Sequence, residues 1–453
     1  MLIPALLILV PAVIVLATMR RKVELLWWVV LVGTAMFPAY GTVVVPASKS
    51  FHVGISSAAL MVTTPMVVVL VALLTVGWRT TIAARKAWAV ALTFGAFLVC
   101  MGVLVWPRDT VTLSGQVHLF IAMLAFPLGA MLASQSRTKR VQLSIVTAVF
   151  LILLAELLIM IAQLGGVQIF PTGVLTQETE GSRPNGTYLH PSVPGKVFVA
   201  LLLILLPLTH SPHSGVRRLA NVAVVVGVII TVISESRTNA FGVLVAVILW
   251  ALINNKMDIG RKFVSIAAVL VAGVLTIPLW ADRIANGEDG SIRSLLWDVG
   301  VAQIAMRPFT GVGPNQYIPV VGQYNLLAAQ GWPVHNTFAL AAAEIGLIGC
   351  VLLFFPLLIV VRKSFTLIPK SANGTPVHAV VAVAPALVLI GCTGWGLLSE
   401  TLPLLFLCLG SAWSSLSTQR PFTLGSAVPA SAISVPLDPR HWLRKHYPGV
   451  GIK

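Results

Sequence analysis

A histidine stands directly before a long apolar stretch in the segment "GWPVHNTFALAAAEIGLIGC", residues 331–350. Imidazole titrates at a pKa of about 6.5, so the neutral ring of His335 can take a proton from a hydroxyl nucleophile at neutral pH. Asn336 follows it immediately, and Glu344 lies further along the same stretch. A histidine in this position can also cap a helix or anchor it at a membrane interface, beside Trp332. The residue types leave a base and a structural histidine as alternatives.

Three further segments carry arginine next to apolar stretches: Arg183 in "GSRPNGTYLHP", Arg237 in "SESRTNAFG" and Arg293 in "SIRSLLWD". The guanidinium group is planar and offers a fork of hydrogen-bond donors that matches phosphate oxygens. Arginines that converge on one cavity would therefore bind a pyrophosphate group. A local ion pair is the alternative for each one, for example Arg237 with Glu235. His190, in the first of these segments, is a second candidate for the role of base.

These residues are embedded in a chain whose composition places it in a membrane. Of 453 residues, 57% are hydrophobic and 10% are charged, and the mean hydropathy is +0.94. A soluble domain of this length does not bury so much apolar surface, so the solvent must be lipid. About thirteen spans of roughly 20 residues are predicted. They lie near residues 2–19, 25–45, 58–78, 87–106, 114–134, 141–163, 194–209, 219–233, 240–254, 263–280, 336–361, 379–398 and 402–416.

The basic residues decide the orientation of these spans. They cluster at Arg20–Lys22, Arg79–Lys86, Arg137–Arg140, Arg217–Arg218, Lys256–Lys262, Arg362–Lys370 and in the C-terminal tail. Each cluster follows an odd-numbered span, which is the alternation expected when basic connectors lie in the cytoplasm. The formal net charge of +16 is therefore a signal of topology, with some attraction for anionic lipid. Nucleic-acid binding is not expected, because the basic residues are scattered over short connectors.

The sequence thus predicts an all-α fold, a polytopic transmembrane helical bundle of about 12 or 13 spans. One transmembrane domain covers residues 1–416, and a cytoplasmic tail covers 417–453. The arginine segments and His335 then share the extracytoplasmic face. The longest connector on that face is 281–335, and within it an amphipathic helix is predicted over 292–306, with Ser291 as N-cap.

The extracytoplasmic connectors offer no ligand set for a metal ion or a nucleotide. They contain no Asp-x-Asp motif and no His/Cys cluster. "GVGP" (residues 311–314) has no Walker spacing and no strand before it, so a turn is the better interpretation. The cysteines fall inside apolar stretches and are interpreted as small buried hydrophobes: Cys100, Cys350, Cys392 and Cys408. We expect neither a metal nor a cofactor.

The segment "HNTFALAAAEIGLIG" resembles the signature of the bacterial O-antigen ligase and O-antigen polymerase superfamily. In that family a periplasmic histidine is followed eleven positions later by a glycine, and here His335 is followed by Gly346. "RPFTGVGPNQY", "SESRTNAFG" and "SRPNGTYLHPSVPG" are similar to the family's preceding turn, short arginine connector and earlier arginine loop. The ligases usually have Arg, three residues, then Leu, whereas Arg237 here leads to Phe241. The family commonly has about twelve spans with both ends inside, and the extra N-terminal span predicted here departs from that pattern.

The resemblance implies a glycosyltransferase of the bacterial inner membrane. Its donor would be an undecaprenyl-pyrophosphate-linked glycan and its acceptor a sugar hydroxyl of a glycan or glycolipid, with inversion and without metal. His335 would be the base, Arg237 and Arg293 would bind the diphosphate, Arg183 would assist, and Glu344 would orient one of these groups. Ligase and polymerase remain open, because they share the donor chemistry. The alternative is a transporter or flippase of lipid-linked sugars, which would use the same arginines for headgroup binding.

Overall fold

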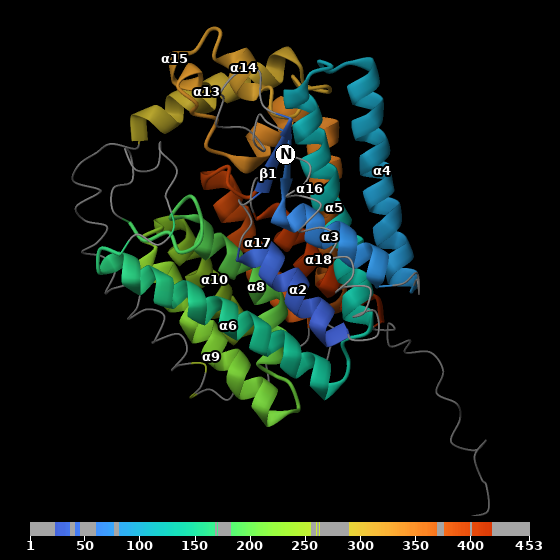
Figure 1. Ribbon diagram of the computed structural model, residues 1–453, viewed down its shortest axis with the longest axis vertical. Coiled ribbons are helices and arrows are strands. Elements are labelled where there is room, and N and C mark those ends of the chain that lie inside the picture. The colour runs from blue at the N-terminus through green and yellow to red at the C-terminus, as the bar shows by residue number, and fades with distance from the viewer. Residues whose placement is uncertain are drawn as a thin grey trace, which may run out of the picture. The chain divides into compact units, whose positions relative to one another are not determined.

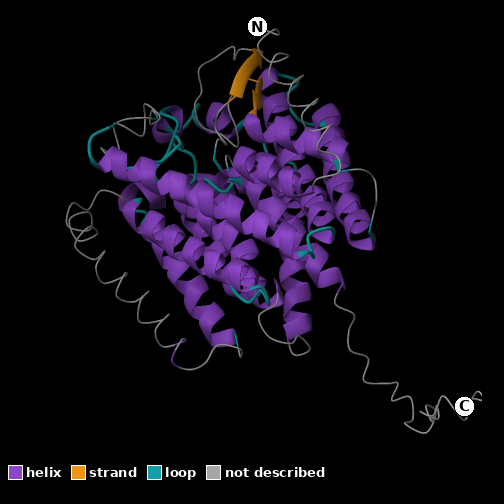
Figure 2. Cartoon of the chain, turned by 60° about the horizontal axis from the view of Figure 1, so that its bottom comes forward, coloured by secondary structure: helices purple, strands orange, loops and turns teal. Residues whose placement is uncertain are grey.

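The computed structural model describes residues 23–36, 41–45, 60–76, 81–167, 170, 183–254, 260, 262, 290–368, 376–398 and 401–418. Within these residues nearly all regular structure is helical (Figures 1 and 2), as the sequence predicts. The predicted spans at 2–19 and 263–280 lie outside the described residues, as does the predicted tail from residue 419 onward.

Six of the described helices are long and apolar enough to cross a membrane. They are α4 (Ile82–Leu104), α5 (Thr110–Ser134), α6 (Lys139–Leu164), α9 (Ser214–Ile233), α16 (Thr337–Leu367) and α17 (Pro376–Thr393). The shorter apolar helices are α2 (Val23–Ala35), α3 (Thr64–Thr75), α8 (Val193–Leu208), α10 (Arg237–Ile253) and α18 (Leu402–Thr418). Each corresponds to one of the predicted spans. The protein is therefore a multi-pass membrane protein.

The predicted spans 25–45 and 58–78 are wrong at one end each. Helix α2 stops at Ala35, and two strands, β1 (Gly41–Val45) and β2 (Leu60–Thr63), form an antiparallel pair before α3 begins. The register has an irregularity between Val43 and Val45. Consecutive valines fit an extended strand better than a helix, because their branched side chains are stiff at χ1. Hydropathy alone does not distinguish the two.

Helices of this bundle begin and end at two opposite ends. Helices α5, α8, α10, α16 and α18 begin at the end that holds His335, which we call the His335 end. Helices α4, α6, α9 and α17 begin at the opposite end. The described basic clusters, such as Arg137–Arg140 and Arg217–Arg218, adjoin the helix termini at that opposite end.

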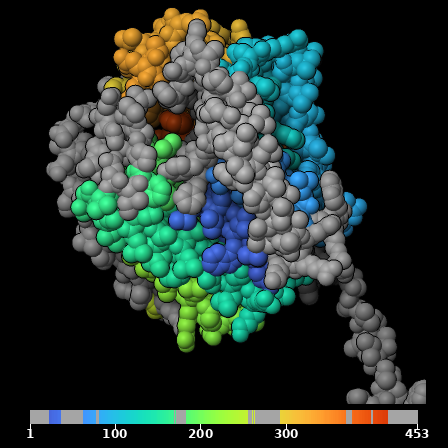
Figure 3. Space-filling view, viewed as in Figure 1, coloured from blue at the N-terminus to red at the C-terminus, as the bar shows by residue number. Residues whose placement is uncertain are grey.

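The described part of the connector before α16, residues 290–336, contains three helices at the His335 end (Figure 1): α13 (Gly290–Met306), α14 (Tyr317–Val321) and α15 (Leu326–Ala329). The helix predicted over 292–306 is therefore confirmed, but Ser291 lies inside it rather than capping it. Only part of its apolar surface is covered, since Leu296 is buried while Leu295 is 55% exposed. In Figure 3 the yellow and orange surface of this connector borders a recess with red atoms of the C-terminal part at its floor.

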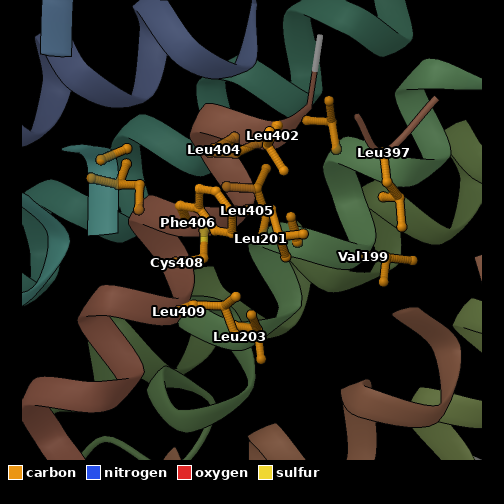
Figure 4. Packing of buried hydrophobic residues seen from close by; sticks show 14 of the residues in the cluster. Val199, Leu201, Leu203, Leu397, Leu402, Leu404, Leu405, Phe406, Cys408 and Leu409 are labelled. Carbon is orange, nitrogen blue, oxygen red and sulfur yellow. The ribbon is translucent and has the colours of Figure 1, made fainter. Parts of the chain in front are cut away.

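The core of the bundle is built around α8, whose residues 193–206 are all buried. A helix that is apolar on every side belongs in the interior of a bundle. Figure 4 shows its leucines beside those of α18. Helices α18 and α5 approach closely at two glycines, because a Cβ on Gly129 would lie 2.0 Å from the Leu407 carbonyl oxygen and one on Gly410 2.0 Å from that of Phe126. Small residues permit such backbone contact between membrane helices.

Helix α16 is interrupted at Gly346, whose φ of 73° and ψ of 168° are not helical. The connector enters this gap. The amide of Leu347 donates to the Pro308 carbonyl at 2.7 Å, and that of Gly313 donates to the Glu344 carbonyl at 2.8 Å. Gly311 and Gly313 also have positive φ, so "GVGP" is the predicted turn. The turn is thus hydrogen-bonded to α16, the helix that begins next to His335.

Candidate functional site

His335 lies in the last turn before α16. Its Nδ1 is 3.0 Å from the carbonyl oxygen of Pro333. Because a carbonyl oxygen only accepts hydrogen bonds, Nδ1 carries the proton in this contact. The lone pair of the neutral ring is therefore on Nε2. The ring also stacks on Trp332, with centroids 6.0 Å apart. Tautomer and orientation are thus both fixed, as a general base requires.

Asn336 fixes the start of α16 in two ways. Its side-chain oxygen accepts from the amides of Phe338 at 2.9 Å and Ala339 at 3.0 Å, which makes it the N-cap. Its Nδ2 donates to the Cys392 carbonyl at 3.3 Å, and the hydroxyl of the next residue, Thr337, donates to the Gly394 carbonyl at 2.5 Å. The residue next to the histidine is therefore a cap that joins α16 to the end of α17.

His190 has the opposite tautomer. Its Nδ1 accepts from the Ser192 amide at 3.0 Å, so the proton of the neutral ring is on Nε2. Burial lowers the pKa of His190 to about 3, together with the positive charges of Lys196, Arg183 and His335. This ring stays neutral at physiological pH and has no lone pair to offer outward. The two histidines lie close enough to repel each other electrostatically, and the acceptor nitrogen of the neutral ring is Nε2 in His335 but Nδ1 in His190.

Lys196 is a candidate site residue that the sequence pattern did not single out. It lies in the first turn of α8, is 8% exposed, and donates from Nζ to the Ser192 hydroxyl at 3.0 Å. A Cβ on Gly396, after α17, would be 2.2 Å from Nζ. The signal was present, since a lysine inside "VPGKVFVALLLILLPL" is a single cation in an apolar helix, and such a residue is a candidate for a functional site.

Arg183 joins its loop to the connector between α9 and α10. Its side chain is 8% exposed, and Nη2 donates to the Ser234 carbonyl at 2.6 Å. Nε lies 3.8 Å from a carboxylate oxygen of Glu235, a residue with φ of 53°. The acid considered as a partner of Arg237 is thus ion-paired with Arg183 in the structure. This interaction brings two distant arginine segments together at the His335 end.

Arg237 is the first residue of α10 and is partly exposed. Two residues further along the chain, the side-chain amide Nδ2 of Asn239 donates to the Ser192 carbonyl at 2.6 Å. The start of α10 is therefore fixed against the start of α8. Arg293 lies further out, exposed on α13, about two turns before Gly300, which packs against Val334.

Glu344 is fully buried at the break in α16. Its Oε2 accepts from the Asn315 amide at 2.9 Å. Nine residues along a helix separate it from His335 by about 13 Å. Its described contact is with the turn that enters the helix, rather than with the histidine or an arginine.

The structure therefore gathers Arg183, His190, Lys196 and His335 in one electrostatic neighbourhood. Arg237 lies two residues after Glu235, the ion-pair partner of Arg183, and is thereby connected to this group. Arg293 and Glu344 lie further away. Among the described residues, no group of three or more His, Cys, Asp or Glu side chains is placed to hold a metal ion. Figure 3 shows the recess at this end, where green atoms of the middle of the chain approach the red atoms at its floor.

Comparison with known protein families gives a match to one part of the chain. Residues 222–354 match the family described as O-antigen ligase, which confirms the resemblance to the O-antigen ligase and polymerase superfamily. The matched segment contains Arg237, Arg293, His335 and Glu344, whereas Arg183, His190 and Lys196 precede it. No curated protein matches the chain. The chain is thus a multi-pass membrane protein in which residues 222–354 are similar to the O-antigen ligase family.

Proposed function

We propose that the protein transfers a glycan from an undecaprenyl-pyrophosphate-linked donor to a sugar hydroxyl, at the extracytoplasmic face of the bacterial inner membrane. The single observation that carries this proposal is the position of His335. Its acceptor nitrogen is set by the Pro333 carbonyl, and it stands beside a cluster of buried cations. The match to the O-antigen ligase family supports the same reaction class.

In this reaction His335 Nε2 takes the proton of the acceptor hydroxyl. The hydroxyl oxygen forms a bond to the anomeric carbon as the bond from that carbon to the pyrophosphate oxygen breaks. Undecaprenyl pyrophosphate leaves with the electron pair, and attack opposite to it inverts the anomeric centre. The negative charge that grows on the leaving oxygen is where preorganised cations lower the barrier most.

The cations around His335 supply that stabilisation. Arg183 and Arg237 offer guanidinium donors to the pyrophosphate, and Lys196 adds a buried point charge at the start of α8. Helices α8 and α10 both begin here, so their dipoles contribute in the same sense. Arg293, exposed on α13, would meet the outer phosphate or the glycan. We assign Glu344 to the support of α16, on the strength of its contact with Asn315.

The test uses the purified full-length protein in detergent with a defined lipid-linked oligosaccharide and an excess of chelator. Glycan transfer without a sealed vesicle is expected, whereas a flippase needs two compartments. His335→Ala should lower the rate by about 10²–10⁴-fold, the usual contribution of a general base. His213→Ala, at the opposite end of the bundle, should retain the rate.

Product mass then separates the two activities of the superfamily. A longer lipid-linked chain identifies a polymerase, and a glycan on a different acceptor identifies a ligase. Full turnover by His335→Ala would refute its role as base. Strict dependence on a divalent ion would refute the metal-independent route.

A further inference from the structure

A second polar cavity lies at the opposite end of the bundle, roughly 16 Å along α8 from Lys196. Its volume is about 420 Å³, and it is lined by the ends of α5, α8 and α18 and the beginnings of α6 and α17. Six of its lining residues are serines, so we call it the serine cavity. It is distinct from the recess at the His335 end, because the two lie at opposite ends of the same helices.

The lining of the serine cavity has the chemistry of an anion site. Besides the serines, its polar side chains include Arg137, Gln142 and His210, and none of the described residues that line it is an acid. Arg137 is exposed, so its guanidinium is available at the cavity. Hydroxyl, amide and guanidinium donors without a competing acid suit phosphate oxygens.

Two of the serines have donors to spare. Ser414 is 2% exposed, and neither its hydroxyl nor that of Ser411 has a hydrogen bond to another described residue. By contrast, the hydroxyl of Ser211 donates to the Gln142 side chain at 3.0 Å. Hydroxyls that line a cavity in this way can donate hydrogen bonds to a polar ligand there.

The remaining wall is apolar and belongs to membrane helices. Ile145 of α6 and Leu203 and Ile204 of α8 line it. A free phosphate ion makes no use of such a wall, whereas an acyl chain does. Exposed basic residues at the same end, including Lys139, attract anionic headgroups to this part of the membrane surface.

We propose that the serine cavity binds an anionic phospholipid of the surrounding leaflet. The headgroup phosphate would contact Arg137 and the hydroxyls of Ser411 and Ser414, and one acyl chain would contact the apolar wall of the cavity at Ile145, Leu203 and Ile204. The site is independent of the transfer reaction, because none of its residues lies at the His335 end.

The experiment measures the thermal unfolding of the delipidated full-length protein while phosphatidylglycerol is added in detergent. Phosphatidylcholine, glycerol phosphate and inorganic phosphate serve as separate additions. The expected result is a concentration-dependent rise in Tm with phosphatidylglycerol alone. Arg137→Ala should weaken the apparent affinity at least about tenfold, as loss of a charge-assisted hydrogen bond predicts.

The matched control is Arg218→Ala, an exposed arginine at the same end that does not line the cavity. It should bind phosphatidylglycerol as the unmodified protein does. Ser411→Trp fills the cavity without removing a charge, and it should also abolish the shift. Equal weakening by both arginine variants would reduce the effect to diffuse surface charge and overturn the proposal. An equal Tm rise with inorganic phosphate or with phosphatidylcholine would overturn it as well.

Discussion

Two loops at the His335 end are each held by a buried glutamate of a membrane helix, but in different ways. In the loop 183–192, the Thr187 amide donates to Glu156 Oε2 at 2.9 Å and its hydroxyl to Oε1 at 2.5 Å. In the turn 308–317, the Asn315 amide donates to Glu344 Oε2 at 2.9 Å. Both carboxylates are 2% exposed or less.

The difference lies in what each loop carries. The loop 183–192 brings Arg183 and His190 to the candidate site, so its glutamate holds a loop that carries one charged and one neutral polar side chain. The turn 308–317 brings backbone into the break of α16, so its glutamate supports a helix. We therefore expect Glu156 to support activity and Glu344 to support the fold.

The largest expected effect is on the turn 308–317. Gly346 adopts φ and ψ that are essentially restricted to glycine, and a Cβ there would lie 2.1 Å from the Phe309 carbonyl oxygen. Gly346→Ala should cost about 3 kcal/mol or more of stability, since rigid backbone must move. Gly186→Ala meets the movable carboxylate of Glu156 at 2.2 Å and should cost about 1–2 kcal/mol.

Thermal unfolding in detergent compares these two alanine variants directly. Gly215→Ala, where an added Cβ meets nothing within 4 Å, is the control for a glycine substitution in the same bundle. A larger loss from Gly186→Ala than from Gly346→Ala would reverse the proposed ranking of the two loops.

The next effect is the change in kcat/KM when Glu156 or Glu344 is replaced. Glu156→Leu and Glu344→Leu each leave buried donors unpaired, at about 1–3 kcal/mol for each donor. We expect Glu156→Leu to lower kcat/KM of the folded fraction, because Arg183 and His190 flank Thr187. Glu344→Leu should lower Tm while the folded fraction keeps its kcat/KM.

Glutamine variants sharpen this result. Glu156→Gln keeps a carbonyl oxygen to accept from Thr187, so it should restore most of the activity that leucine removes. Identical kinetic losses in Glu156→Leu and Glu344→Leu would show that both glutamates serve the same purpose, against the comparison made above.

The apolar pattern of the sequence predicts most of the bundle, because hydropathy over about 20 residues suffices to define a span. It does not predict β1 and β2, since "GTVVV" is equally apolar as a strand or a helix end. The break in α16 also escapes prediction. Gly346 occupies the position that the family resemblance marks, but its geometry depends on a turn some thirty residues earlier in the chain.

The candidate site was predicted in part for a related reason. Residue type identified the arginines and His335, because few charged groups occur outside the basic clusters. Lys196 was hidden by the apolar residues around it, which made 194–209 an ordinary span. The pairing of Arg183 with Glu235 could not be predicted, since it depends on how two connectors meet in space.

A smaller effect tests whether Lys196 acts on donor use together with Arg183 of the loop 183–192. Lys196→Met keeps the length of the side chain and removes the charge, so kcat/KM for the lipid-linked donor should fall about tenfold or more. The pKa of His190 should rise, because Lys196 is one of the charges that lower it. Lys139→Met, an exposed lysine at the opposite end, is the control. A change in Tm without a change in kinetics would make Lys196 a structural residue.

The last effect is a pH dependence confined to the loop 183–192. His190 binds a proton near pH 6.5 when unfolded and only near pH 3 when folded, so the unfolded state holds more protons between these values. Its contribution to stability is complete above about pH 6.5 and is lost as the pH falls below it. The slope approaches about 1.4 kcal/mol per pH unit within that window.

Hydrogen exchange resolves where this loss occurs. Between pH 6.5 and 5, a range within the window set by these pKa values, amides of the loop 183–192 should lose protection once intrinsic rates are corrected. Those of the turn 308–317 should not, because no histidine lies in it. His190→Gln removes the titrating group and should flatten the dependence. Equal acid sensitivity of both loops in that variant would assign the effect to other groups, such as His335 beside the same cluster.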